Sequence, residues 1–261
     1  MRVLFIGDVV GSPGRRGLRE TMPALREQHA PDLIIVNGEN SAGGIGITER
    51  TANDFFGIGT DVITTGNHVY RHREAYDFLD REERVVRPAN YPAGNPGRGH
   101  TVVAAGGRRV AVINLSGAVG LNVARSPFDT VDGILDRLEA DAIVVDFHAE
   151  VTSEKVAMGW HLDGRVAAVL GTHTHVPTAD GRVLPKGTAF ICDVGMTGSR
   201  TSVLGVKPEQ ALNSLITQMP TRFETAEGDV WVMGAVVDVN DRGLADSFTQ
   251  VMVPAVSTEG P

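Results

Sequence analysis

The chain has 261 residues, 42% of them hydrophobic and 21% charged, and a formal net charge of −8. Length and composition are those of a globular protein that can bury a substantial core, so we expect residues 1–261 to form a single domain. The negative charge argues against a broad nucleic-acid-binding face, and the lack of a long apolar run argues against a membrane span.

The first 180 residues alternate short apolar runs with helical patterns, which is typical of parallel β-α units. The expected strands are Val3–Ile6, Leu33–Val36, Val62–Thr65, Val110–Asn114, Ile143–Phe147 and Val166–Leu170. The expected helices are residues 14–30, 48–59, 71–82 and 152–160. We expect Pro23 to kink or split the first helix and Thr48 to cap the second. Thr152 or Ser153 is expected to cap the last.

The later part of the chain has a different pattern. Before that part, residues 101–115 predict a β-hairpin with Gly106 and Gly107 in its turn. After about residue 180, alternating patterns predict antiparallel strands within 182–195, 229–240 and 245–254. One more helix is expected at residues 206–219.

Nothing in the sequence divides the chain, because it has no linker, repeat or low-complexity stretch. Only the tail Ser257–Pro261 is expected to be disordered. The single cysteine, Cys192, excludes an internal disulfide framework and fits a core residue in a reducing cytoplasm. The pattern predicts one two-sheet α/β domain with its helices outside.

Polar residues follow five of the expected strands at their carboxyl ends, which is the edge where open α/β sheets bind ligands. Four of the eight histidines in the chain lie at these ends. The residues, in chain order, are Asp8, Glu39, Asn40, Asn67, His68, His148, His173 and His175.

Each of these residues also has an ordinary explanation. Asp8 can cap the next helix, Glu39 and Asn40 can form a solvated turn, and His148 can be a hydrogen-bonded core imidazole. Their convergence instead favours a metal site of carboxylates, amide oxygens and imidazoles, a mixture suited to Mn, Fe, Zn, Co or Ni. The set is too large for one tetrahedral ion and about sufficient for two, and a pair of ions about 3.5–4 Å apart suits in-line displacement at phosphorus.

The same segments resemble the calcineurin-like metallophosphoesterase superfamily through five motifs in order: GD (7–8), GEN (38–40), GNH (66–68), FHAE (147–150) and GTHTH (171–175). Two positions depart from the superfamily pattern. Val10 stands where the usual D-x-H motif has histidine, and the bridging acid is Glu39, followed by Asn40, instead of aspartate. Both departures are similar to the small bacterial branch typified by the YmdB phosphodiesterases, as are three further segments: RPANYP (87–92), VDFHAEVTSEK (145–155) and DVGMTG (193–198).

The resemblance implies a four-layer α/β/β/α sandwich of two mixed sheets and two transition-metal ions per chain, with Fe or Mn favoured and Zn, Co or Ni as alternatives. It implies one ion on Asp8, Glu39, Asn40 and His175. The second ion would be held by Glu39, Asn67, His148 and His173, so that Glu39 bridges the two. His68 is implied to be the acid that protonates the leaving oxygen.

Three acidic residues near these ligands are candidate acceptors for the ligand imidazoles, or else solvated turn residues: Asp146, Glu150 and Asp180.

The resulting hypothesis is a binuclear phosphodiesterase, in which a hydroxide held between the ions attacks phosphorus. Members of the YmdB branch are described as acting on cyclic nucleotides such as 2′,3′-cAMP, so a small phosphoester is the expected partner. A phosphomonoesterase and a non-catalytic nucleotide- or metal-sensing regulator stay open as alternatives. An amidohydrolase also uses H-x-H, but on the first strand of a barrel. Substrate-binding residues and the oligomeric state, a homo-oligomer included, are left undetermined.

Overall fold

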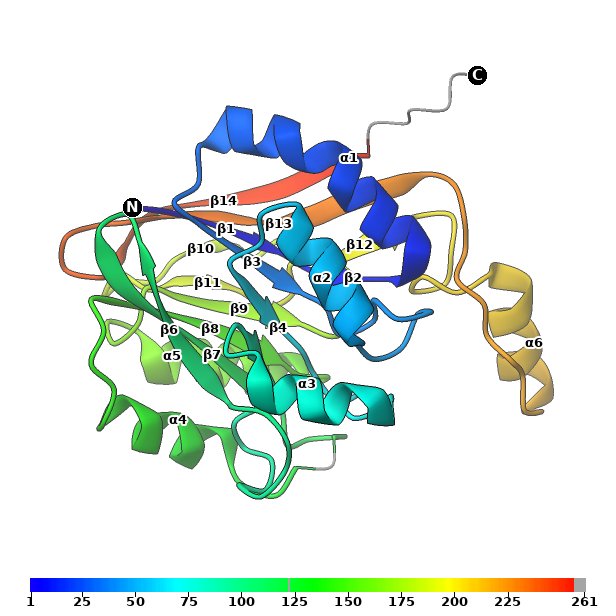
Figure 1. Cartoon of the computed structure of the whole chain (residues 1–261), viewed down its shortest axis with the longest axis horizontal. Coiled ribbons are helices and arrows are strands. Elements are labelled where there is room, and N and C mark those ends of the chain that lie inside the picture. The colour runs from blue at the N-terminus through cyan, green and yellow to red at the C-terminus, as the bar shows by residue number, and fades with distance from the viewer. Residues whose placement is uncertain (122, 256–261) are drawn as a thin grey trace.

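The computed structural model describes residues 1–121 and 123–255, so the expected disorder of Ser257–Pro261 lies outside the described residues. Two β-sheets pack face to face, and helices cover both outer faces (Figure 1). This is the α/β/β/α arrangement that the resemblance implied, and the predicted fold class is confirmed.

The first sheet contains eight strands in the order β2-β12-β13-β1-β3-β4-β5, with β14 paired to β13. Its parallel part comprises β1 (Arg2–Ile6), β3 (Leu33–Asn37), β4 (Val62–Thr64) and β5 (Val85–Val86). The remaining strands are β2 (Asp8–Val9), β12 (Met196–Ser199), β13 (Val230–Val239) and β14 (Ala245–Pro254). Because β1, β3, β4 and β5 are parallel, their carboxyl ends lie at one edge of the sheet.

The second sheet has the order β10-β11-β9-β8-β7-β6. Its strands are β6 (His100–Ala105), β7 (Arg108–Ser116), β8 (Ala142–His148), β9 (Ala168–Thr172), β10 (Arg182–Val183) and β11 (Ala189–Ile191). Strands β7, β8, β9 and β11 are parallel, whereas β6 and β10 pair antiparallel at the two margins. The β6–β7 pair is the predicted hairpin, with Gly106 and Gly107 in its turn.

The central strands are apolar on both faces because each face is covered. Along β1, Val3 and Phe5 pack into the core between the sheets, while Leu4 and Ile6 face the helices. This is the two-residue alternation of a strand, here with hydrophobic residues on both sides. Continuous apolar runs in the sequence therefore correspond to strands buried between two layers.

Three helices cover the first sheet: α1 (Gly11–His29), α2 (Glu49–Gly57) and α3 (Tyr76–Arg81), the last preceded by the 3₁₀ turn η1 (Arg73–Ala75). Two cover the second sheet: α4 (Pro127–Leu135) and α5 (Thr152–Leu162). None of the helices in the described part of the chain is long and apolar enough to cross a membrane.

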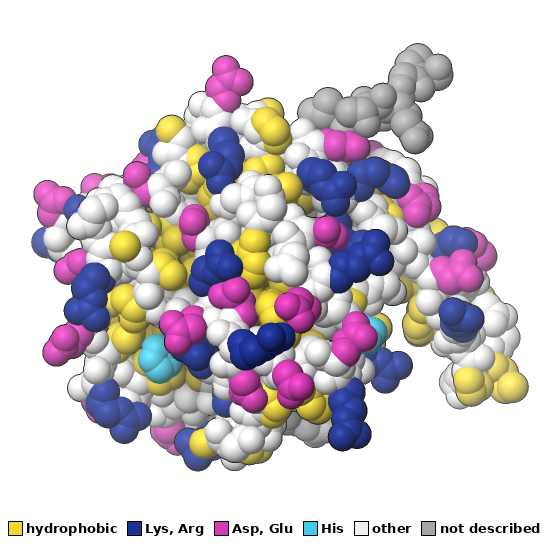
Figure 2. Space-filling model, in the orientation of Figure 1, with side chains coloured by type: hydrophobic (Ala, Val, Ile, Leu, Met, Phe, Trp, Pro, Cys, Tyr) yellow, Lys and Arg dark blue, Asp and Glu magenta, His cyan; other side chains and the backbone are white. Residues whose placement is uncertain are grey.

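The remaining helix, α6 (Pro208–Thr217), projects from the body instead of covering a sheet (Figures 1 and 2). We call residues 203–226, which leave the body, form α6 and return, the arm. Hydrophobic side chains gather toward the far end of the arm in Figure 2, and Leu215 is 73% exposed.

Three sequence expectations concern helices α1, α5 and α2, and the structure contradicts the first two and confirms the third. Pro23 lies inside an unbroken α1, where its ring faces solvent while the adjacent Met22 and Leu25 are buried, so packing holds the helix despite one lost backbone bond. The expected Thr152 or Ser153 cap of α5 is wrong, because the helix begins at Thr152 without a side-chain cap. The Thr48 cap of α2 is confirmed by a reciprocal capping box with Thr51.

One helix and one strand boundary differ from the sequence expectations. Helix α4 was not expected, although it carries local signals, with Ser126 as its cap and Pro127 in its first turn. Strand β9 begins at Ala168 instead of Val166 and continues through the polar Thr172, because Thr172 pairs with His148 of β8.

Candidate metal centre

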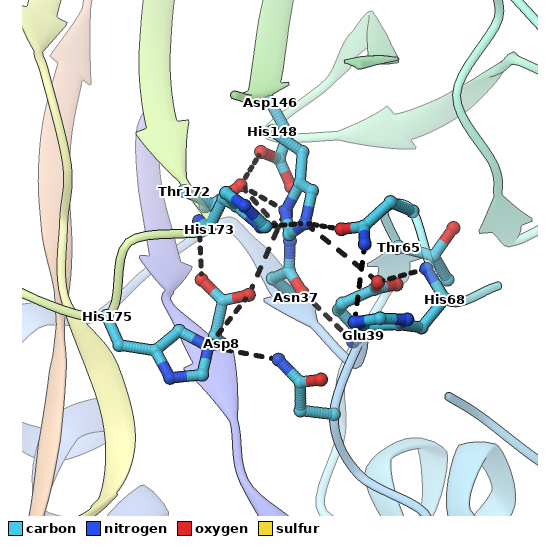
Figure 3. A network of polar contacts seen from close by, with 12 residues as sticks. Asp8, Asn37, Glu39, Thr65, His68, Asp146, His148, Thr172, His173 and His175 are labelled. Carbon is cyan, nitrogen blue, oxygen red and sulfur yellow. Dashed lines mark hydrogen bonds and ion pairs between the residues drawn. The ribbon is translucent and has the colours of Figure 1, made fainter. Parts of the chain in front are cut away.

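The eight residues singled out from the sequence meet at the edge where the carboxyl ends of both sheets lie, and Figure 3 labels all of them except Asn40 and Asn67. Asp8 is on β2, His148 is the last residue of β8, and His173 directly follows β9. The other residues are in loops: Glu39 and Asn40 after β3, Asn67 and His68 after β4, and His175 after β9. The structure thus brings together residues from five segments of the chain.

Each of the three candidate histidine ligands has one ring nitrogen held by an outer partner. His148 Nδ1 lies 2.9 Å from Thr172 Oγ1, and His173 Nε2 lies 3.0 Å from Glu150 Oε2. His175 Nδ1 lies 3.0 Å from the carbonyl oxygen of Leu204. Partners of this kind fix the orientation and tautomer of metal-binding imidazoles in proteins.

The outer partners determine where the ring hydrogens are. A carbonyl only accepts, so His175 donates from Nδ1 to the Leu204 carbonyl, whereas His173 Nε2 and Glu150 Oε2 make a charge contact at 3.0 Å. The Thr172 hydroxyl donates its own hydrogen to Asp146 Oδ1 at 2.7 Å, so it accepts from His148 Nδ1. Burial lowers the pKa of His148 well below its ordinary value and also lowers the pKa of His173, which disfavours the protonated form of both rings. With its hydrogen on Nδ1, the neutral His148 ring offers a lone pair at Nε2.

Two further polar atoms lie close to His148 Nε2. His148 Nε2 lies 3.0 Å from His173 Nδ1 and 3.0 Å from Asn67 Oδ1, and the amide nitrogen of Asn67 is directed instead toward His68 Nε2 at 3.3 Å. His148 Nε2 and Asn67 Oδ1 are both acceptors, and two acceptors at this spacing repel unless a cation lies between them. Two atoms that bind one ion at about 2.1 Å and about 90° apart are about 3 Å from each other, so the spacing fits a shared metal ion.

Two buried carboxylates add unpaired oxygens to the same site. Asp8 Oδ1 and Glu39 Oε2 have no hydrogen-bond partner among the described residues, and both side chains are fully buried. Their other oxygens accept backbone hydrogens, Asp8 Oδ2 from His173 at 3.1 Å and Glu39 Oε1 from His68. Burial raises the pKa of Asp8 and raises that of Glu39 well above its usual range. A cation is the partner that lets such carboxylates stay ionised.

The predicted ligands are not equally well oriented. Asn40 Nδ2, not its oxygen, lies 3.0 Å from His175 Nε2, so the Asn40 amide would have to turn over to offer an oxygen. Asp8 Oδ1 is 3.8 Å from His175 Nε2, and Glu39 Oε1 is 3.9 Å from His148 Nε2. Among residues 1–121 and 123–255, no three His, Cys, Asp or Glu side chains form a metal cluster by themselves. The candidate set therefore depends on the two asparagine amides.

Gly66, the first residue of the GNH motif, has a steric role. A Cβ at this position would lie 2.3 Å from the His148 ring, so only glycine lets the loop after β4 pass against that imidazole. The close approach is what brings the Asn67 oxygen within reach of His148 Nε2.

The H-x-H turn is strained and is held by a buried ion pair. His173 and His175 have φ of 98° and 66°, a region that costs non-glycine residues about 1–3 kcal/mol. Between them, Thr174 donates to Asp193 Oδ2 from its backbone nitrogen at 3.0 Å and from its hydroxyl at 2.7 Å. The same Asp193 oxygen accepts from Lys155 Nζ at 2.8 Å, and both side chains are 1% exposed. We call Lys155 and Asp193 the clamp.

The sequence analysis missed the clamp, although both residues lie in segments that carried the family resemblance. Of the acceptors it proposed, Glu150 contacts His173 directly, and Asp146 acts on His148 through Thr172. Asp180 does not act as such an acceptor, because its Oδ1 accepts from Thr178 and from the Cys192 backbone, so only the alternative of a turn residue stays open for it. The signal for Asp193 was an acid at the end of an apolar run, the same signal that identified Asp8.

Known proteins resemble this chain over nearly its whole length. A family model described as YmdB-like protein matches residues 4–251. A Bacillus subtilis protein named 2′,3′-cyclic-nucleotide 2′-phosphodiesterase is 48% identical over 244 residues, which cover 93% of this chain and 92% of the relative.

Two solved structures are also similar. A hypothetical protein from Thermus thermophilus has a TM-score of 0.93 and 40% identity, covering 98% of this chain and 100% of that one. A structure described as a novel phosphatase from Mycoplasma pneumoniae has a TM-score of 0.92 and 31% identity, covering 97% and 93%.

Proposed function

This chain belongs to the YmdB-like protein family of the metallophosphoesterase superfamily, and from that premise we propose that it hydrolyses 2′,3′-cyclic nucleotides at a two-metal centre. Family membership and the names of its relatives make it a hydrolytic phosphoesterase. The cyclic-nucleotide substrate is proposed from the name of the B. subtilis relative. The observation that supports the metal centre is the 3.0 Å approach of two acceptors, His148 Nε2 and Asn67 Oδ1, beside two buried carboxylate oxygens that have no hydrogen-bond partner among the described residues.

We assign the ligands to two groups. Asp8, Glu39, Asn40 and His175 would hold one ion. Glu39, Asn67, His148 and His173 would hold the other, with Glu39 shared. When bound, the two ions supply activation of the attacking water and stabilisation of the charge that develops on the phosphate oxygens.

The protein residues contribute orientation and a proton. Thr172 and the Leu204 carbonyl keep the hydrogens of His148 and His175 on the outer nitrogens, so that the inner lone pairs stay available, and Glu150 contacts the outer nitrogen of His173. His68 would protonate the ribose oxygen as the P–O bond breaks. Burial, with the nearby His173 and Arg71, lowers the pKa of His68, which makes its protonated ring a stronger acid toward a leaving alkoxide.

Metal analysis combined with a hydrolysis screen tests the proposal. Protein reconstituted with Mn or Fe should carry close to two ions per chain and hydrolyse 2′,3′-cAMP faster than adenosine 2′-monophosphate. Faster hydrolysis of the monoester would support the phosphomonoesterase alternative. Two ions with no turnover of either would support a regulator. Binding of never more than one ion would remove the binuclear centre.

The role of His68 is tested by a change of leaving group. His68→Ala should keep both ions but turn over 2′,3′-cAMP about 10²–10⁴-fold more slowly than the wild type, because a ribose alkoxide needs a proton to leave. Its loss on bis-p-nitrophenyl phosphate should be much smaller, because nitrophenolate leaves without one. Loss of metal would make His68 a ligand, and equal losses on both substrates would make it a positioning residue.

A further inference from the structure

A pocket of about 380 Å³ lies between the loop that follows β3 and the base of the arm. We call it the side pocket, and its walls are Val10, residues 43–45, Arg71, residues 204–206 and residues 221–225. This volume is within the range of about 300–1,000 Å³ that is usual for small-molecule sites.

The walls of the side pocket that come from the body lie within a few residues, along the chain, of the candidate ligands or of His68. Val10 follows Asp8 after one residue, Gly43 lies shortly after Asn40, and Arg71 lies one turn after His68. On the arm, the Leu204 carbonyl accepts the Nδ1 hydrogen of His175 at 3.0 Å. A ligand in the side pocket is therefore placed next to the reacting group by the same segments that hold the candidate metal ligands.

Backbone contacts hold the arm side of the pocket in place. The two limbs of the arm are joined by hydrogen bonds from Lys207 to the Glu224 carbonyl at 3.0 Å and from Ala226 to the Gly205 carbonyl at 2.9 Å. The second limb rests against the loop after β3, where a Cβ on Gly44 would lie 2.9 Å from Thr225 Cγ2. The pocket is therefore formed before any ligand arrives.

The walls combine apolar surface with unpaired positive charge. Phe223 and Leu204, both on the arm, are 52% and 48% exposed and both line the side pocket, so apolar surface is available to a ligand there. Arg71 and Arg222 make no ion pair within the described part of the chain, whereas the Glu224 carboxylate is held by Lys207 at 2.6 Å. In a chain of net charge −8, this local excess of cations favours an anionic ligand with an apolar, planar part.

We propose that the side pocket binds the nucleobase of the substrate, with the Phe223 ring stacked on the base and Arg71 facing the phosphate. This inference rests on the proposed function and specifies its substrate class as nucleotides, not simple phosphodiesters. Inorganic phosphate or a small diester would need the cations but not the apolar wall. A base offers a π-face to Phe223, and stacking on one aromatic side chain contributes without sequence preference.

The test compares two cyclic phosphodiesters on the metal-loaded full chain. Both 2′,3′-cAMP and glycerol 1,2-cyclic phosphate carry the same five-membered ring at phosphorus, but only the first has a base. Phe223→Ala should reduce the ratio of their kcat/KM values, 2′,3′-cAMP over the glycerol compound, by about 5- to 150-fold, the range that stacking of one base contributes. Phe223→Tyr, which keeps the ring, should restore the ratio.

Leu215→Ala is the matched control, because Leu215 is an exposed apolar residue of the same arm that does not line the side pocket. It should leave the ratio unchanged. A Phe223→Ala ratio within about twofold of the wild type would overturn the inference, and so would an equal loss on both substrates, which would show that Phe223 supports the metal centre itself.

A binding measurement separates this inference from the proposed function. Equilibrium dialysis with adenosine 2′-monophosphate should show binding to the wild-type chain that Phe223→Ala weakens and Leu215→Ala does not. Such binding without turnover of 2′,3′-cAMP would keep the side pocket and overturn the phosphodiesterase. Turnover of 2′,3′-cAMP with no effect of Phe223→Ala on either measurement would keep the phosphodiesterase and overturn the role of the side pocket.

Discussion

The candidate metal centre has histidines on two sides, and the backbones that carry them differ: one side is a regular strand and the other is a strained turn. His148 ends a regular strand, and its outer partner Thr172 lies opposite it in the β8–β9 ladder, so strand register alone brings the two together. His173 and His175 instead stand on a turn with two left-handed non-glycine residues, and that turn is tied through Thr174 to the clamp.

The difference shows that an imidazole can be aimed at a metal either by register or by a strained turn with its own support. The register side needs no special backbone, because neighbouring strands are already hydrogen-bonded. The turn side needs an additional buried ion pair, and its geometry is only as stable as that pair. Substitutions on the turn side should therefore lower the stability of the fold, whereas substitutions on the register side should lower metal affinity.

The largest effect is expected at the clamp. Lys155→Met leaves the Asp193 carboxylate buried without its cation, and breaking a buried pair in this way destabilises a protein by about 3–5 kcal/mol. Urea unfolding of the metal-free protein measures the loss. The double variant Lys155→Met/Asp193→Asn, which removes both charges, should recover part of it. A loss below about 1 kcal/mol for Lys155→Met would mean that the turn does not depend on the clamp.

A smaller effect, on metal affinity instead of folding, is expected on the register side. Thr172→Val keeps the shape of the side chain but removes the acceptor for His148 Nδ1, and losses of such partners weaken metal binding by about 10- to 100-fold. Calorimetric titration with Mn²⁺ measures the affinity. Thr60→Val is the control, because the buried Thr60 hydroxyl has no hydrogen-bond partner among the described residues. Equal affinities in the two variants would contradict the role given to Thr172.

The smallest effect is expected for the outer partner of His173. The Glu150 side chain is 58% exposed, so in Glu150→Ala water can take its place on His173 Nε2. Exposed pairs contribute about 0.2–1 kcal/mol, so Mn²⁺ affinity should fall by no more than about fivefold. The same titration as for Thr172→Val gives the comparison. A loss as large as that of Thr172→Val would show that exposure does not distinguish the two sides.

The strands and most of the candidate site could be predicted from the sequence because both leave local signals. A strand covered on both faces reads as a continuous apolar run, as in Val3–Ile6, and a polar residue directly after such a run, as at Asp8 or His148, is conspicuous. Since parallel strands share one carboxyl edge, those residues were expected to meet before any contact was known.

The tertiary structure alone decided how the site is supported and what adjoins it. Lys155 and Asp193 are 38 residues apart and carry no local pattern that pairs them. The same holds for the outer contacts of the histidines with Thr172, Glu150 and the Leu204 carbonyl. It also holds for the side pocket, whose Phe223 comes from the returning limb of the arm. Periodicity reports which face of an element is buried, whereas a hydrogen bond or an ion pair between distant segments depends on distances that only the packing of the two sheets sets.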